Sequence, residues 1–196
     1  SSLNSDVMLR QMSDHIKKNV SYDELQLILT WLDSDLASRV VNAELQSADP
    51  KFQQNLMHYM AELQTTPPSP ERTKVIINYV ESSEIVEQST KMFMAMLENM
   101  FEAFKVTEPE NVELAKQLDI QLQQMAANIK PAMEQQMTLT SYFIYRDISN
   151  KDLNQYSRFY KQDTGKKYLS LMVGAIGDGM NEWGASLIQQ IAKEKS

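Results

Sequence analysis

The sequence predicts an all-α fold, a helical bundle or a stack of helical hairpins with seven to nine helices, and three observations support this prediction. Glycine is scarce, and all five glycines lie between Gly165 and Gly184. No stretch combines β-branched residues with the apolar–polar alternation of a strand. A two-helix pattern occurs twice, at residues 20–41 and 148–169. Few turn glycines and long helical periodicity are typical of an all-α protein.

The helices before residue 66 follow from apolar spacing and start signals. Apolar spacing predicts an amphipathic first helix at residues 6–18. The first copy of the repeat predicts two further helices, which end near residue 47. Asp49 followed by Pro50 is a strong helix start, because Asp is a favoured N-cap and proline fits the first helical position. We expect the fourth helix to end near residue 64.

The first copy of the repeat predicts a helix, a tight corner and a second helix. Ser21 and Glu24 have the spacing of a capping box, in which two side chains satisfy two free backbone N–H groups. Leu25 adds the apolar contact that follows such a cap, and Trp31 continues the apolar face. Asp35 is then predicted to cap the second helix.

The second copy aligns with the first without a gap, at an offset of 128 residues. In this copy Ser149 and Asp152 are the cap and its box partner, and Gly165 lets two helices approach closely at the corner. The residues that carry the repeated pattern are Ser149, Asp152, Leu153, Phe159, Tyr160, Asp163 and Gly165. The agreement indicates an internal duplication; the alternative is two hairpins that use the same signals independently.

The second copy also resembles a known family. Phe159, Tyr160, Gly165, Lys166 and Lys167 are similar to the Phe-Tyr-x-Ser-Pro-x-Gly-[Lys/Arg]-[Lys/Arg] stretch of the bacterial "domain of unknown function 2059" family. The resemblance covers about residues 140–196, with a degenerate copy at about 12–47. The chain departs from the family at residues 162–163, which are Gln-Asp instead of Ser-Pro.

The resemblance implies an all-helical protein that Gram-negative bacteria export, with a periplasmic or other exported location after removal of a signal peptide. It implies no catalytic residue, because the family has no agreed activity.

The chain after residue 64 contains one linker and three long helical stretches. The linker TTPPSP, residues 65–70, predicts a boundary between an N-terminal half, 1–66, and a long-helix half, 70–196, although one compact domain is the alternative. Ser82-Ser83 is expected to interrupt the stretch that follows. Thr107 with Pro109 predicts the next start, and Pro131 predicts a kink or break near residues 127–130.

The segment MFMAMLENMFEAF, residues 92–104, is the most prominent candidate for function. Its methionine and phenylalanine side chains have three interpretations: a methionine-filled core, an adaptable groove for a ligand or partner, and a Cu(I) site, which thioethers favour. The candidate groove residues are Met92, Phe93, Met96, Met100, Phe101 and Phe104.

Composition argues against several other classes of protein. The net charge of −7 disfavours nucleic acid and anionic membranes as main partners. No apolar run approaches the ~20 residues of a membrane span. His15 and His58 have no second ligand at metal spacing, and Gly174 and Gly177 are better explained by close helix packing than by a phosphate loop. The sequence predicts no catalytic residue, cofactor or metal.

We therefore expect a non-enzymatic binding or interaction module for a partner protein or an apolar ligand. The alternatives are an enzyme or enzyme accessory with a site assembled from scattered residues, and a structural subunit that forms homo-oligomers, for which a homodimer is possible.

Overall fold

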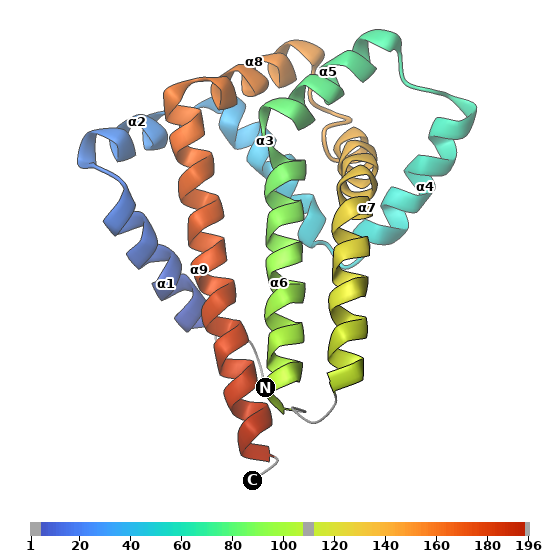
Figure 1. Ribbon diagram of the computed structural model, residues 1–196. Coiled ribbons are helices and arrows are strands. Elements are labelled where there is room, and N and C mark those ends of the chain that lie inside the picture. Colours follow the sequence, from blue (N-terminus) through green and yellow to red (C-terminus); the bar gives the residue numbers. More distant parts are fainter. Residues whose placement is uncertain (1–4, 108–111, 195–196) are drawn as a thin grey trace. The chain divides into compact units, whose positions relative to one another are not determined.

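The computed structural model describes the backbone of residues 5–107 and 112–194, and the side chains of residues 8–102, 105 and 112–180. Within these residues the chain forms nine α-helices, one short 3-10 helix and no strand (Figure 1), so the predicted all-α class is confirmed. The elements are α1 (Ser5–Asn19), α2 (Tyr22–Leu32), α3 (Asp35–Leu45), η1 (Gln46–Ala48), α4 (Phe52–Thr65), α5 (Pro70–Ser82), α6 (Ile85–Thr107), α7 (Val112–Ile144), α8 (Asn150–Lys161) and α9 (Asp163–Glu194).

The helices form two compact units that do not follow chain order. The first unit contains the described parts of 1–20, 87–131 and 170–196, and the second contains 21–86 and 132–169. The long helices α6, α7 and α9 each contribute residues to both units. The predicted linker, residues 65–70, connects α4 to α5 within the second unit.

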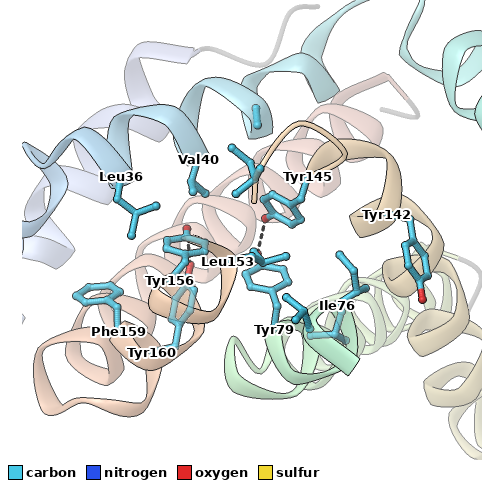
Figure 2. Packing of buried hydrophobic residues seen from close by; sticks show 14 of the residues in the cluster. Leu36, Val40, Ile76, Tyr79, Tyr142, Tyr145, Leu153, Tyr156, Phe159 and Tyr160 are labelled. Carbon is cyan, nitrogen blue, oxygen red and sulfur yellow. Dashed lines mark hydrogen bonds between the residues drawn. The ribbon is translucent and has the colours of Figure 1, made fainter. Parts of the chain in front are cut away.

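The second unit has a closed apolar core. Val40 from α3, Ile76 from α5 and Leu153 from α8 are fully buried, with 0% of each residue exposed (Figure 2). Tyrosine and phenylalanine rings from α5, α8 and the end of α7 surround them. Because truncation of such a buried aliphatic side chain costs about 2–5 kcal/mol, these helices hold one another in place.

Both copies of the repeat lie in the second unit, and they contact each other through equivalent positions. The rings of Trp31 and Phe159, which align at the offset of 128, stack with centroids 3.6 Å apart. Two ion pairs are reciprocal in the same way.

In the first pair, Lys167 Nζ lies 3.2 Å from Glu24 Oε1, and in the second, Arg39 Nη2 lies 3.1 Å from Asp152 Oδ2. Glu24 aligns with Asp152 and Arg39 with Lys167, so each acid of one copy meets the base of the other. Reciprocal contacts of this kind are the mark of a two-fold interface.

The helix caps confirm part of the predicted pattern. Ser21 and Glu24 form a complete capping box. The prediction that Asp35 caps the next helix is wrong: the Ser34 hydroxyl accepts the hydrogen bond of the Ala37 N–H, and Asp35 is the first helical residue. Asp163 is likewise the first residue of α9, after an extended Gln162. Both aspartates still place negative charge at a helix N-terminus, where it is favourable.

The second copy keeps the cap but not the full box. The Ser149 hydroxyl accepts from the Asp152 N–H at 3.1 Å, as predicted, whereas the shorter Asp152 carboxylate pairs with Arg39. Gly165 confirms the tight corner, since a Cβ built on it would lie 1.9 Å from the Phe159 carbonyl oxygen. Ile148 and Leu153 both belong to the buried core.

Several helix boundaries differ from the predictions for local reasons. Helix α4 begins at Phe52, because the Asp49 carboxylate accepts from the Lys51 N–H and closes a turn before the helix. The interruption predicted at Ser82-Ser83 is present and is followed by Glu84 with a φ of 51°.

Two predicted features of the long helices are also resolved. Thr107 ends α6, and the rest of its predicted start signal, residues 108–111, lies outside the described residues. Helix α7 continues through Pro131 without the predicted break, although Pro131 is where the two units divide. Proline removes one backbone hydrogen bond, and the other bonds of this long helix suffice to continue it.

Candidate functional site

The methionine-rich segment lies on α6 in the first unit, and the structure does not make it a closed core. Met92, Phe93, Met96 and Phe101 are half-buried, and Met100 is 54% exposed. The side chain of Phe104 lies outside the described residues. The candidate side chains that the structure describes are therefore partly buried, apart from the exposed Met100.

Few of the described apolar side chains of the first unit are fully buried. Among its described residues the buried apolar side chains are Leu97, Leu171 and Ala175. Its exposed large apolar side chains are Leu9, Met100, Val112, Ile120 and Met125, each at least 38% exposed. Exposed apolar side chains mark an interaction surface when they form a continuous patch.

Helix α6 lies beside the N-terminal half of α7 (Figure 1), and two salt bridges join the pair. Lys105 Nζ lies 2.8 Å from Asp119 Oδ1, and Lys130 Nζ lies 2.8 Å from Glu87 Oε2. The pairing of late residues of one helix with early residues of the other shows that the two run antiparallel. On α7, apolar side chains at helical spacing are half-buried, at Ala115, Leu118, Leu122 and Ile129.

Thr90 places a polar atom in the apolar part of α6. Its Oγ1 is buried and has no hydrogen-bond partner in the described part of the protein. Thr90 lies seven residues before Leu97, so the two share one face of the helix. A buried hydroxyl without a partner is rare and destabilising, because the group loses its hydrogen bonds to water.

Helix α1 packs on α9 through a histidine and two glycines. His15 Nδ1 lies 2.7 Å from Asp178 Oδ2, and a Cβ built on Gly174 would lie 2.3 Å from His15 Nε2. A Cβ on Gly179 would lie 3.0 Å from Met8. The prediction that Gly174 permits close packing is therefore confirmed, and His15 is a helix-packing residue.

The same prediction fails for Gly177, where a Cβ would meet nothing within 4 Å. Helix α9 continues through Asp178-Gly179 without a break. Trp183 and Gly184 belong to the part of α9 whose side chains are outside the described residues.

The second unit contains a cluster of tyrosines around one carboxylate that the sequence did not predict. Glu44 Oε1 accepts hydrogen bonds from the hydroxyls of Tyr145, at 2.7 Å, and Tyr156, at 3.1 Å. The hydroxyls of Tyr79 and Tyr145 are 2.5 Å apart, and those of Tyr156 and Tyr160 are 2.9 Å apart (Figure 2). Two chains of hydrogen-bonded tyrosine hydroxyls therefore both end on Glu44 Oε1.

Burial dominates the electrostatics of this cluster. It raises the pKa of the Glu44 carboxyl, an effect that the hydrogen bonds from Tyr145 and Tyr156 partly offset. No cation pairs with Glu44 among the described residues. Burial also raises the pKa of Tyr156 and of Tyr160, which keeps their hydroxyls protonated as donors.

A cleft of about 720 Å³ opens beside the predicted linker, also within the second unit. It lies between the end of α4, the start of α5 and the turn before α8. Its lining residues are Tyr59, Glu62, Leu63, Thr65, Thr66, Pro67, Pro68, Ser69, Arg72, Arg146, Ile148, Ser149 and Asn150.

Arg72 of α5 donates hydrogen bonds to the turn before α8 and so links two walls of this cleft. Its Nη1 donates to the Ile148 carbonyl and to Asn150 Oδ1, and its Nη2 donates to the Tyr145 carbonyl at 2.5 Å. No local pattern predicts this role, because the acceptors lie 73–78 residues away along the chain.

Three further observations complete the description. No group of three or more metal-binding side chains occurs among the described residues. No helix in the described part of the chain has the length and apolarity needed to cross a membrane. No family model, curated protein or solved structure matches the chain.

Proposed function

We propose that this protein is a non-enzymatic binding module that holds an apolar partner against α6 and α7 of its first unit. The observation that carries the proposal is that, among the described residues of that unit, three apolar side chains are buried and five large apolar side chains are exposed. Methionine side chains repack easily, which suits a surface that must adapt to a partner helix or an acyl chain.

The contacts within the first unit are consistent with this role. The salt bridges at residues 87–130 and 105–119 fix the two helices at their ends. Met96 and Met100 lie on α6 between those fixed ends. The buried, unpaired hydroxyl of Thr90 adds one polar group to an otherwise apolar face.

The resemblance of the second repeat copy to the "domain of unknown function 2059" family supports two further parts of the proposal. The protein belongs to that family or is related to it, and it acts in the periplasm or another exported location. These parts are independent of the binding surface, and detection of the mature chain in a periplasmic extract tests them.

Native mass spectrometry on protein purified from the organism that encodes it tests the binding function. We expect a bound lipid or protein in the wild-type spectrum and its loss in Met100→Glu. Leu27→Glu is the matched control, because Leu27 is 59% exposed but belongs to the second unit. A spectrum with only the unbound monomer, or equal loss in both variants, would contradict the proposal.

The same spectrum distinguishes the structural alternative. The exposed apolar side chains of the first unit would also suit a second copy of the chain. A dimer mass that Met100→Glu abolishes and Leu27→Glu preserves would favour a homo-oligomeric subunit over a carrier of another molecule.

A further inference from the structure

The cleft of the second unit is electropositive, although the protein as a whole is acidic. The chain has a formal net charge of −7. The cleft is lined by two arginines, Arg72 and Arg146, and by one acid, Glu62. Glu62 Oε1 lies 3.2 Å from Nε2 of His58, which precedes it by one helical turn.

Arg72 contributes a positive charge that pairs with no carboxylate among the described residues. Its three hydrogen bonds all go to uncharged acceptors, two backbone carbonyls and the Asn150 side chain. These bonds use both protons of Nη1 and one of Nη2. A guanidinium has five protons, so the Nε–H and the second Nη2 proton remain for another acceptor.

Arg146 stands on the same lining and is fixed by its neighbours. Its Nη1 donates to the Phe143 carbonyl, its Nη2 donates to Gln46 Oε1, and its carbon Cζ lies 4.3 Å from the centre of the Phe143 ring. Among the described residues, the exposed Asp147 is its one ion-pair partner, with Oδ2 lying 3.5 Å from Arg146 Nε. Arg146 therefore adds to the positive potential of the cleft without needing to move.

Two helix starts reinforce this potential. Ser69 caps α5 and Ser149 caps α8, and both residues line the cleft. A helix N-terminus carries a partial positive charge, which favours a nearby anion. The proposed site rests on the cavity and its two arginines, and the helix ends strengthen it.

We propose that this cleft binds a small oxyanion, a carboxylate or phosphate group, with Arg72 as the principal donor and Arg146 as the second cation. Guanidinium is well matched to both groups, because its planar donors fit two oxygens at once. The apolar lining from Leu63, Pro67 and Ile148 gives room for the organic part of such a ligand.

The test titrates the full-length protein with inorganic phosphate and, separately, with acetate, and follows backbone amide shifts by NMR at constant ionic strength. We expect saturable shifts confined to residues 59–72 and 146–150. The stronger of the two titrations identifies the preferred oxyanion. Shifts that never saturate, or that spread over the whole surface, would overturn the proposal.

Three variants separate the site from general charge effects. Arg146→Gln should weaken binding about tenfold, the effect of losing one charged contact. Glu62→Gln should tighten binding, because it removes the only acid from the lining. Lys161→Gln is the control, since Lys161 pairs with Asn78 away from the cleft, and it should leave binding unchanged. Equal weakening in Arg146→Gln and Lys161→Gln would show a non-specific effect and refute the site.

Arg72 itself needs a separate readout, because its loss would release the turn before α8. Arg72→Lys keeps the charge and loses the planar donors. We expect weaker anion binding with a retained thermal unfolding transition, and unchanged binding in a folded Arg72→Lys variant would contradict the role assigned to Arg72.

Discussion

Trp31 and Phe159 occupy equivalent positions of the two repeated segments, and their rings stack face to face with centroids 3.6 Å apart and planes 8° apart. A residue can contact its own counterpart only near an axis of two-fold symmetry. The ion pairs Glu24–Lys167 and Asp152–Arg39 exchange partners around that contact. The two copies therefore pair as two subunits of a symmetric dimer would, within one chain.

The helix corner of the second copy predicts opposite effects for two glycine substitutions. Gly165→Ala should destabilise the protein by about 2 kcal/mol or more, because the new Cβ would overlap the Phe159 carbonyl oxygen. Gly177→Ala should stabilise it by roughly 0.5–1 kcal/mol, since the Cβ there meets nothing and alanine favours a helix. Chemical denaturation of both variants measures the difference, and equal effects would refute the corner.

The unpaired hydroxyl of Thr90 predicts a stabilising substitution. Thr90→Val keeps the shape of the side chain and removes a buried polar group, so it should raise the free energy of unfolding by about 1 kcal/mol. Thr30→Val is the control, because the Thr30 hydroxyl is exposed and already donates to the Gln26 carbonyl. Thermal melts of the two variants test this, and a destabilised Thr90→Val would mean that the hydroxyl has a partner.

The Glu44 cluster predicts a stability that falls as pH rises. Burial raises the pKa of Glu44 above 4.5 in the folded state, so folding favours its protonated form. The stability from this group is full below about pH 4.5 and is lost as pH rises through the raised pKa. Wild type should therefore lose stability relative to Glu44→Gln as pH rises above about 4.5 and through the raised pKa.

Glu24 provides a control of opposite sign in the same unit. Hydrogen bonds from Ser21 and the nearby Lys167 lower the pKa of Glu24 below 4.5. Wild type should be more stable than Glu24→Gln at about pH 7, and this advantage should vanish as pH falls below 4.5 through the lowered pKa. Denaturant unfolding of both variants across this range measures the two slopes, and slopes of the same sign would contradict the assigned environments.

The sequence allowed prediction of features that depend on neighbours along the chain. The Ser21 box, the Ser149 cap, the interruption after Ser82 and the tight approach at Gly165 each need only a few adjacent residues. The error at Asp35 came from a choice between two adjacent residues that both suit a helix start, Ser34 and Asp35, and only the backbone geometry distinguishes them.

The candidate sites depend on contacts that local patterns do not encode. Glu44 meets its tyrosine partners 101 and 112 residues later in the chain. Arg72 meets the turn before α8 in the same way. The sequence does carry one indication that the two copies pair. The acids Glu24 and Asp152 are at equivalent positions, and so are the bases Arg39 and Lys167, so each copy carries charges complementary to those of the other.

Cross-linking of engineered cysteines tests the reciprocal pairing of the two copies most directly, because the chain has no cysteine of its own. One double variant carries cysteine at Glu24 and Lys167, the other at Arg39 and Asp152, and each is treated with a short bis-maleimide. We predict that both variants cross-link within one chain, that urea abolishes both products, and that single-cysteine variants give none. Cross-linking in only one of the two double variants, or only between separate chains, would contradict the two-fold pairing.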